Sequence, residues 1–333
     1  MARPAGRAKA ELFQHAPGRL VVRPALGDAF QPHRSLEVTP EFLEEVVTRL
    51  RQRGLDLVSV DEARRRLVER DLSRRFVALT FDDGYRDNLE FALPILERHG
   101  VPFALYVPSA FADGTGYLWW VVLERAVARS DAIDIVLDGE QRHFDCATDG
   151  AKRETFGALY WWLRGLPNES DMRARIAGLA ERAGVDTSAI CREHCMNWDE
   201  VRQLAANPLV TIGAHTATHP MLRKATAETV RAEIGTGLAR TEEMLGVRPR
   251  HFSFPVGDPT SAGPREFAIA REFGFATAVT TRPGVIFPEH RDHLDALPRI
   301  SVNGEFQRLR YLDVLLSGAP TAIVNRFRRV NAA

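Results

Sequence analysis

The chain has 333 residues, of which 45% are hydrophobic and 26% charged, so it is long enough for one large domain or two ordinary ones with a full core. Its 44 basic and 44 acidic residues cancel, which argues against nucleic acid or an anionic membrane as a partner attracted by overall charge. Three cysteines, Cys146, Cys191 and Cys195, are too few for a disulfide framework, and we expect reduced thiols rather than a metal knuckle at residues 191–195.

The first residues show no sign of a targeting segment. Residues 1–17 include Arg3, Arg7 and Lys9 but no apolar stretch of the kind found in signal peptides. No apolar run reaches the roughly 18 residues that a membrane-spanning helix needs. We therefore expect a cytoplasmic protein without a transmembrane segment. The sequence carries no signal for the oligomeric state.

Short apolar strands alternate with amphipathic helices along most of the chain. Residues 39–53 are predicted as a helix, with Thr39 as N-cap, Pro40 at the first position and Gly54 after its end. The other predicted elements are strands at 76–80, 103–107, 209–212, 251–254, 276–280 and 300–302, and helices at 86–99, 197–206, 226–245, 263–273 and 305–316. The alternation predicts an α/β fold, a (β/α) barrel of about seven parallel strands, with an open doubly wound sheet as the competing architecture. We expect residues 1–333 to form a single domain with its core at about 36–318.

The regular pattern stops between about residues 110 and 195, which we interpret as a helical and aromatic insertion, or a lid, on the barrel. Aromatic side chains cluster at residues 117–120 and 160–163. Trp119 and Trp120 are candidate substrate-binding residues, because an indole face can stack on the apolar face of a sugar ring. The alternative, that these side chains pack the insertion's own core, is at least as well supported.

Two adjacent carboxylates, Asp82 and Asp83, follow the strand at 76–80, and Gly84 provides the turn that ends it. Neighbouring carboxylates at the mouth of a buried strand repel each other and need a cation or a shared proton nearby. The pair therefore predicts a metal ligand or an acid/base pair, with an ordinary polar turn as the alternative.

Two histidines, His215 and His219, follow the strand at 209–212. Histidines four residues apart can present both imidazoles to one ion, and functional residues of a barrel gather at the carboxyl ends of its strands. Two histidines and one carboxylate make a three-ligand set with open positions for water, as expected of a catalytic zinc or a similar divalent ion. The joint occurrence of the two motifs favours a metal site over a chance spacing.

The motifs Thr80-Phe81-Asp82-Asp83-Gly84 and His215-Thr216-Ala217-Thr218-His219 resemble the first two motifs of the polysaccharide deacetylase (NodB-homology) family, carbohydrate esterase family 4. Further matching pieces, in a compatible order, lie at residues 198–199, 212–214, 254–257 and 297–300. The resemblance extends over about residues 36–302. It implies a deformed (β/α) barrel and metal-dependent hydrolysis of N-acetyl groups, or sometimes O-acetyl groups, on amino sugars.

The resemblance also implies a role for each matching residue. Asp83, His215 and His219 would bind a divalent metal, with Zn²⁺ expected first and Co²⁺, Ni²⁺, Fe²⁺ or Mn²⁺ as alternatives. Asp82 would be the general base that takes a proton from the metal-bound water. Thr216 or Thr218 would orient the histidine loop through hydroxyl bonds to the backbone.

In the turn formed by Pro255, Val256 and Gly257, the backbone N–H of Val256 would stabilise the oxyanion and Pro255 would contact the substrate. Arg299 is a candidate to orient Asp82 through a charged hydrogen bond, with an ordinary surface salt bridge as the alternative.

The sequence departs from the family pattern in two places. Residues 252–256 lack the Arg and Tyr that many members carry around the proline turn, and no Leu-x-His motif supplies a general acid near the carboxyl end of the chain. His251 and His293 are candidates for the acid, although each is at least as well explained as a packing or surface residue. The leaving amine needs a proton, so this role stays open.

We therefore expect a metal-dependent hydrolase that removes an N-acetyl group from an amino sugar in a glycan or a glycan precursor. Its partner would be an N-acetylated saccharide. A hydrolase of another acyl or non-peptide C–N bond is the second hypothesis, because the metal chemistry is not restricted to sugars. A non-catalytic carbohydrate-binding barrel is the third, and the missing general acid is its support.

Overall fold

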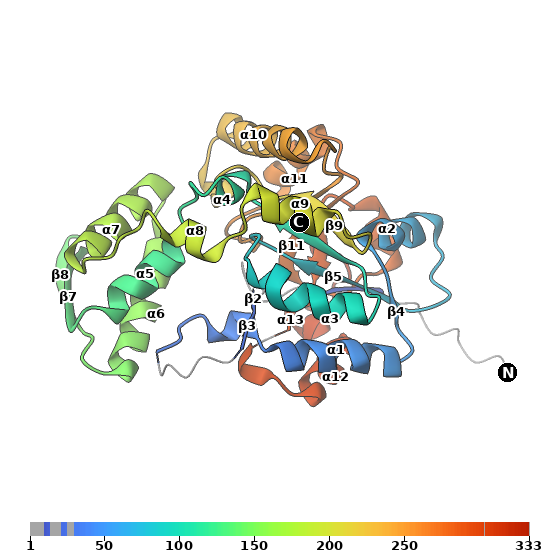
Figure 1. Cartoon of the computed structure of the whole chain (residues 1–333), viewed down its shortest axis with the longest axis horizontal. Coiled ribbons are helices and arrows are strands. Elements are labelled where there is room, and N and C mark those ends of the chain that lie inside the picture. Colours follow the sequence, from blue (N-terminus) through green and yellow to red (C-terminus); the bar gives the residue numbers. More distant parts are fainter. Residues whose placement is uncertain (1–9, 14–20, 25–29, 303, 333) are drawn as a thin grey trace.

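A parallel sheet forms the centre of this computed structural model, which describes residues 10–13, 21–24, 30–302 and 304–332. The strand order is β1-β5-β6-β9-β10-β11-β12, and β4 also pairs with β5. Every pairing in this sheet is parallel. Since β12 also contacts β1, the sheet curls into a half-barrel with helices around it (Figure 1). The predicted α/β barrel is confirmed.

The strands of the sheet are β1 (Ala10–Phe13), β4 (Asp56–Leu57), β5 (Phe76–Phe81), β6 (Phe103–Val107), β9 (Val210–Ala214), β10 (His251–Ser253), β11 (Thr277–Pro283) and β12 (Leu297–Arg299). Two small sheets pair β2 (Val21–Val22) with β3 (Glu37–Val38) and β7 (Ala132–Leu137) with β8 (Glu140–Asp145).

The α-helices are α1 (Pro40–Gln52), α2 (Val60–Glu69), α3 (Leu93–Arg98), α4 (Ser109–Ala112), α5 (Trp119–Ala128), α6 (Asp149–Gly165), α7 (Glu169–Arg182), α8 (Ile190–His194), α9 (Trp198–Ala205), α10 (Ala227–Leu245), α11 (Pro264–Glu272), α12 (Leu309–Leu316) and α13 (Ala319–Val324). Short 3₁₀ turns lie at η1 (Arg34–Leu36), η3 (Leu222–Lys224), η4 (Pro288–Asp292) and η5 (Gly304–Phe306), and a π-helical turn at η2 (Asn88–Ala92). In the part of the chain that the structure describes, none of these helices has the length and apolarity required to cross a bilayer.

The helix ends follow local chemistry that is visible in the sequence. The Thr39 hydroxyl accepts a hydrogen bond from the Phe42 N–H at 3.2 Å, and Pro40 occupies the first position of α1. Helix α9 begins with the expected capping box of Asn197 and Glu200. Helix α10 ends at Gly246, whose φ of +70° is the left-handed conformation that glycine adopts at little cost.

Two predicted elements are wrong in detail. The expected helix at 86–99 begins as the π-helical turn η2, in which the Leu93 N–H reaches Asn88 O, and becomes α-helical at Leu93. Pro94 has no N–H to donate, so the regular ladder cannot form across this point. The expected strand at 300–302 instead lies at β12, because its pairing with β11 begins at Leu297 and ends at Arg299. Ile300 is apolar and buried, and it follows β12 as a single β-bridge residue.

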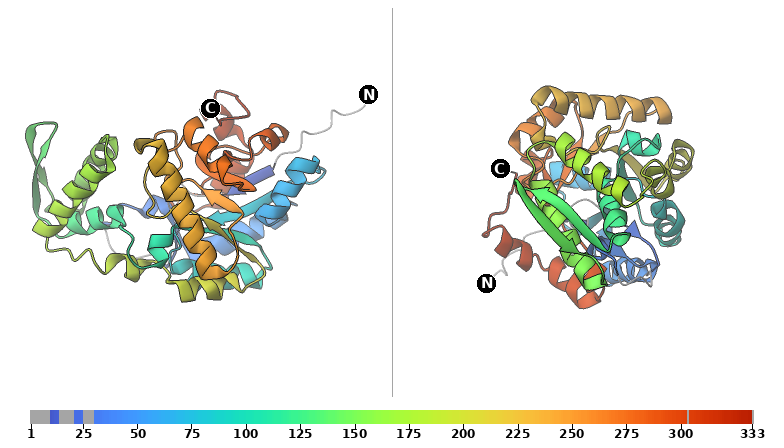
Figure 2. Two further views of the ribbon diagram at one scale, coloured as in Figure 1. Left: turned by 90° about the horizontal axis from the view of Figure 1, so that it is seen from above. Right: turned by 90° about the vertical axis from the view of Figure 1, so that its left-hand side faces the viewer.

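Residues from α5 to α8 form a lobe at one end of the molecule, and the β7–β8 hairpin is its outermost part (Figure 2). The lobe has its own hydrophobic core, which includes Trp119, Trp120, Leu159 and Ile176. Tyr85 and Val256, from loops of the barrel, belong to the same core. The lobe therefore rests directly on these loops. The expected boundaries of the core at 36–318 and of the insertion at 110–195 stay predictions.

Candidate metal centre

The turn after β5 carries the two adjacent carboxylates. All six residues of β5 are buried, and the chain turns immediately after Phe81. Asp83 and Gly84 have φ angles of +71° and +68°, a conformation that glycine adopts at little cost but that costs Asp83 free energy. Asp82 is 1% exposed and Asp83 is fully buried. The strained turn thus holds two carboxylates below the surface.

The histidine loop after β9 is held just as tightly. Thr216 and His219 have φ angles of +63° and +61°, and the Thr216 hydroxyl accepts a hydrogen bond from the His219 N–H at 3.1 Å. On α10, the carboxylate of Glu233 accepts hydrogen bonds from the Ala217 and Thr218 N–H groups at 3.2 and 2.9 Å. Backbone strain that the surroundings over-determine is typical of functional sites.

Asp83, His215 and His219 converge on one point. The Nε2 atoms of His215 and His219 lie 3.3 and 3.2 Å from Asp83 Oδ1. Among the described residues these three form the one group of His, Cys, Asp or Glu side chains whose ligand atoms all lie within 4.8 Å of one another. Both Asp83 oxygens and both Nε2 atoms are buried without a hydrogen-bond partner in the described chain. Orphaned donors and acceptors of this kind are costly, so the arrangement fits a bound cation.

The second ring nitrogen of His215 is also fixed. Its Nδ1 donates to the backbone carbonyl of Ser253 at 2.6 Å, which leaves Nε2 with a lone pair directed at Asp83. Metal-ligating histidines characteristically donate their other nitrogen in this way. For Asp83, burial raises the pKa, but the nearby imidazoles of His219 and His215 outweigh it and lower the pKa to about 2. The carboxylate therefore stays ionised, as a metal ligand must.

Asp82 is held by Arg299. The guanidinium donates from Nη1 to Asp82 Oδ1 at 3.1 Å and from Nη2 to Oδ2 at 2.9 Å. It also donates to Ser253 Oγ and Thr280 O, and it is fully buried. Burial lowers the pKa of Arg299, while Asp82 opposes this. The pair is a bidentate, charge-assisted contact inside the barrel rather than a surface salt bridge.

The turn after β10 places a strained valine beside the lobe. Val256 has a φ of +61°, which is rare for a β-branched residue, and its carbonyl accepts a hydrogen bond from Thr281 Oγ1 at 2.7 Å. The described residues offer no acceptor to the Val256 N–H. Pro255 is buried, and its carbonyl accepts from the Gly257 N–H at 2.6 Å. The oxyanion role of Val256 and the substrate contact of Pro255 stay predictions.

Trp119 and Trp120 lie inside the lobe. They are 3% and 7% exposed, which leaves little of either ring available to a sugar. The Trp119 ring stacks on Tyr160 at a centroid distance of 5.1 Å. Trp120 donates from Nε1 to the Tyr85 hydroxyl at 2.9 Å, and its ring centroid is 5.2 Å from that of His219. These contacts agree with the alternative in which both side chains pack the insertion's own core. Trp120 also packs against the ring of His219.

In the described part of the chain, neither histidine considered as a general acid contacts the metal cluster. His251, at the amino end of β10, is fully buried, with Nδ1 2.8 Å from Thr277 Oγ1 and Nε2 3.3 Å from Asp61 Oδ1. His293 follows η4 and is half-buried. Their catalytic roles stay predictions, and so does the identity of the acid. Cys146, Cys191 and Cys195 are buried and take part in no disulfide among the described residues.

Sequence reasoning missed two residues that support the site. Ser253 uses its carbonyl for His215 and its hydroxyl for Arg299, and so connects the metal-binding half of the site to the Asp82 half. Glu233 fixes the histidine loop from α10. The position of Ser253 at the end of a predicted strand was a usable signal, whereas Glu233 is one acidic residue among several on its helix.

Comparison with known proteins gives the family of this chain. The family model described as polysaccharide deacetylase matches residues 69–135 and 169–278, which together make up more than half of the chain. The chain belongs to the polysaccharide deacetylase family. The matched segments contain Asp82, Asp83, His215 and His219, whereas Arg299 and residues 136–168 lie outside them. Comparison with curated proteins gave no match.

Solved structures of deacetylases share the fold over nearly the whole chain. The Streptococcus pyogenes deacetylase PplD, in complex with acetate, superposes with a TM-score of 0.61 at 14% identity, covering 93% of this chain and 99% of that one. A de-N-acetylase from Aggregatibacter actinomycetemcomitans gives a TM-score of 0.56 at 13% identity, covering 92% and 99%. IcaB from Ammonifex degensii gives 0.53 at 18% identity, covering 92% and 98%. At these identities the likeness establishes the polysaccharide deacetylase fold.

Proposed function

We propose that this member of the polysaccharide deacetylase family is a metal-dependent hydrolase that removes an N-acetyl group from an amino sugar in a glycan or a glycan precursor. The observation that carries the proposal is the convergence of Asp83, His215 and His219, buried and without other partners for their ligand atoms, beside the Asp82–Arg299 pair. One carboxylate and two neutral imidazoles suit Zn²⁺ best, and Co²⁺, Ni²⁺, Fe²⁺ and Mn²⁺ accept the same ligands.

Each residue of the site has a distinct task in this proposal. A divalent ion held by the three ligands would polarise the acetyl carbonyl and acidify a water molecule. Asp82 accepts the proton, and Arg299 fixes both of its oxygens so that the carboxylate keeps one orientation. The free N–H of Val256 offers a hydrogen bond to the negative charge that develops on the carbonyl oxygen. Ser253 keeps the His215 and Arg299 halves of the site in register.

The test measures bound metal by elemental analysis and acetate release from a panel of N-acetylated saccharides. Wild-type protein, Asp82→Asn and His215→Ala are compared. We expect His215→Ala to lose the metal, because two ligands hold an ion far less tightly than three. Asp82→Asn should keep the metal and lose activity by at least about 100-fold, the usual contribution of a general base.

The outcomes separate the alternatives. Wild-type protein that stays free of metal in supplemented buffer would remove the basis of the site assignment. Bound metal with no acetate release, but with saccharide binding, would favour the non-catalytic barrel, and turnover of acyl compounds other than sugars would favour the broader hydrolase. The cytoplasmic location is also part of the proposal, and fractionation of cells that produce the native chain tests it.

A further inference from the structure

A second concave site lies where the lobe meets the barrel. A cavity of about 360 Å³ opens between η1 with the residues before it, helix α6 and turn η5. This volume falls within the roughly 300–1,000 Å³ typical of small-molecule sites. Its α6 wall consists of residues 153–161, which belong to the segment 136–168 that lies between the two family-matched parts of the chain. The cavity is therefore built largely by a part of this chain that the family pattern does not cover.

Aromatic rings form one side of the cavity. Phe156 and Tyr160 stack with their centroids 5.6 Å apart, and Trp161 meets Tyr160 edge-on at 5.3 Å. Trp161 is 64% exposed, whereas Trp119 and Trp120 are almost completely buried. Isolated exposed apolar residues are common, but an indole at the rim of a cavity floored by two further rings is a more specific arrangement. The rings give a bound molecule an apolar surface to lie on.

Polar groups also line the cavity. Gln31 and Ser35 come from η1 and the residues before it, Glu305 from η5 and Arg153 from α6. A few polar groups together with an aromatic surface match a pyranose, whose C–H face is apolar and whose edge carries hydroxyl groups in fixed directions. Acidic and basic residues occur together here, so the lining does not select for an anion or a cation.

Gly157 adds no side chain to the lining of the cavity. It lies inside α6, where glycine is less favourable than alanine, and it lines the cavity between Phe156 and Tyr160. A Cβ placed on Gly157 meets no atom within 4 Å. Packing against neighbouring protein atoms therefore does not account for the glycine, whereas a ligand that lies close to the helix does.

The cavity neighbours the metal centre through Trp120. His33, which lines the cavity and is 5% exposed, has its Nε2 3.3 Å from the Trp120 carbonyl oxygen and 3.4 Å from Glu124 Oε2. The ring of the same Trp120 contacts His219. Trp120 thus lies between a residue of the cavity lining and a metal ligand, which places the cavity close to the metal centre.

We propose that this cavity is a saccharide-binding subsite, in which a sugar unit several residues away from the cleaved acetyl group stacks on Trp161. The proposal rests on the proposed deacetylase function and makes its substrate an oligosaccharide or a polymer rather than a single sugar. Because the subsite contributes binding far from the reacting bond, it increases affinity for long substrates and leaves that for monosaccharides unchanged.

The experiment uses N-acetylglucosamine and its β-1,4- and β-1,6-linked hexasaccharides as probes. Dissociation constants are measured by titration calorimetry for wild-type protein, Trp161→Ala and Gly157→Leu, and KM and kcat are measured wherever acetate is released. We expect at least one hexasaccharide to bind wild-type protein about tenfold or more tightly than the monosaccharide, a difference of about 1.4 kcal/mol. Both variants should lose this advantage through KM, with kcat retained.

Gly165→Leu is the matched control for Gly157→Leu. Gly165 ends the same helix, and a Cβ there also meets no atom within 4 Å, but it does not line the cavity. It should bind the hexasaccharide like wild type. The proposal is overturned if neither hexasaccharide binds more tightly than the monosaccharide, or if Trp161→Ala and Gly157→Leu bind like wild type. Binding does not require turnover, so hexasaccharide binding without acetate release would contradict the proposed deacetylation and leave the subsite supported.

Discussion

Arg299 is a fully buried cation whose counter-charge, Asp82, is buried with it. Removal of one partner of such a pair leaves an uncompensated charge inside the barrel and typically costs about 3–5 kcal/mol. We therefore expect Arg299→Met to lower the free energy of unfolding by about that amount and to abolish activity, because Asp82 is no longer oriented. Urea denaturation measures the first effect and acetate release the second.

The double variant Asp82→Asn/Arg299→Met is the control for this prediction. It removes both charges, so it should be more stable than Arg299→Met alone although it carries one substitution more. Arg299→Met within about 0.5 kcal/mol of wild type would mean that solvent reaches Asp82, contrary to the 1% exposure of this residue.

Residue chemistry explains which parts of the site could be predicted from the sequence. Asp83, His215 and His219 were expected as ligands because only a few residue types bind metal, and their spacing after strands restricts where they can meet. Ser253 was not expected, because its role depends on β10 lying beside β9, a pairing of segments nearly 40 residues apart along the chain. The general acid was not found from the sequence either. The contacts of the candidate His251 also depend on the fold, and in the described structure it contacts Thr277 and Asp61.

Helix α10 sets the position of the histidine loop through a close approach of two backbones. A Cβ on Gly237 would lie 2.3 Å from the Thr216 carbonyl carbon and oxygen. In a helix interior Gly→Ala normally adds up to about 1 kcal/mol of stability. A loss of stability in Gly237→Ala would therefore be caused by the clash with the Thr216 backbone. We expect a net loss of about 1–3 kcal/mol and a weaker metal affinity, measured by denaturation and by competition with a chelator.

Gly235 provides the comparison within the same helix. A Cβ there would lie 3.3 Å from the half-buried Phe273 ring, which has room to move. Gly235→Ala should retain wild-type metal affinity and equal or greater stability. If Gly237→Ala matched Gly235→Ala in both measurements, the close approach of α10 would not be what positions the loop.

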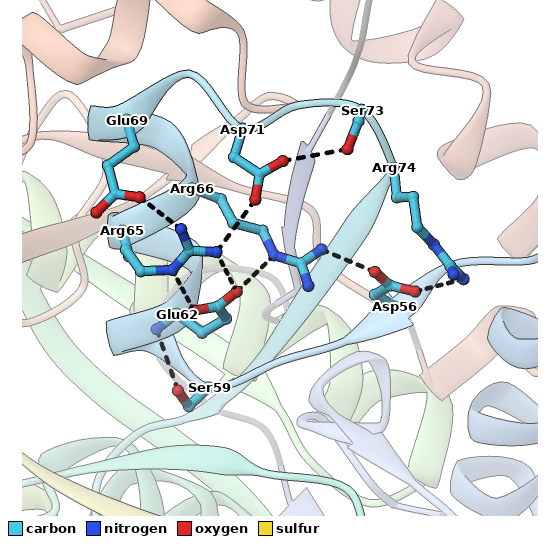
Figure 3. A network of polar contacts seen from close by, with 9 residues as sticks. All are labelled: Asp56, Ser59, Glu62, Arg65, Arg66, Glu69, Asp71, Ser73 and Arg74. Carbon is cyan, nitrogen blue, oxygen red and sulfur yellow. Dashed lines mark hydrogen bonds and ion pairs between the residues drawn. The ribbon is translucent and has the colours of Figure 1, made fainter.

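Helix α2 carries a network of ion pairs at the opposite, amino ends of the strands (Figure 3). Glu62 binds Arg65 at 2.7 Å and Arg66 at 2.7 Å, and Arg66 continues to Asp56 on β4 at 2.8 Å. The hydrogen bonds from Arg65 and then Arg66 lower the pKa of Glu62 to about 2. The network ties α2 to β4, which pairs with β5.

The lowered pKa of Glu62 has a defined consequence for stability against pH. The folded pKa lies below the unfolded value of about 4.3, so the stabilisation is fully present above that value and is lost as pH falls toward 2. Glu62→Gln should therefore be less stable than wild type at pH 7, by less than about 1 kcal/mol for each of these partly exposed pairs. Denaturation at several pH values should show the difference shrinking below about pH 4.5. A difference that stays constant down to pH 2.5 would contradict the assignment.

At the scale of elements, features set by local signals were predicted from the sequence, whereas features set by long-range strand pairing were not. Helices α1, α9 and α10 were predicted with their caps, because Thr39, Asn197 and Gly246 act within one turn of the chain. The β7–β8 hairpin was missed even though Asp138-Gly139, both with positive φ, is the dipeptide that favours such a turn. The strand at 300–302 was misplaced because its bounds depend on pairing with β11.

For the whole molecule, the alternation of strands and helices was enough to predict a barrel, since parallel strands need crossover helices. The curl and the strand order are properties of the assembled sheet. They bring residues from distant segments of the chain together. Asp83 follows β5, His215 and His219 follow β9, and Arg299 ends β12. The site is thus assembled only when the half-barrel is complete, which couples the site to global stability.

This coupling predicts the effect of metal on thermal unfolding. An ion that binds only the folded chain stabilises it by about 2.7 kcal/mol when present at 100 times its Kd. With about 2.1 cal/mol/K of unfolding entropy per residue, that corresponds to a rise in Tm of about 4 °C for a chain of this length. Calorimetry with and without Zn²⁺ should show the shift in wild-type protein and in Glu62→Gln, whose network lies away from the ligands, but not in Asp83→Asn.

Loss of the metal should also lower the temperature at which the lobe unfolds, because Trp120 packs on His219 and Val256 belongs to the core of the lobe. If the lobe melted at the same temperature in both states, the contact through Trp120 would not transmit the stability of the metal site.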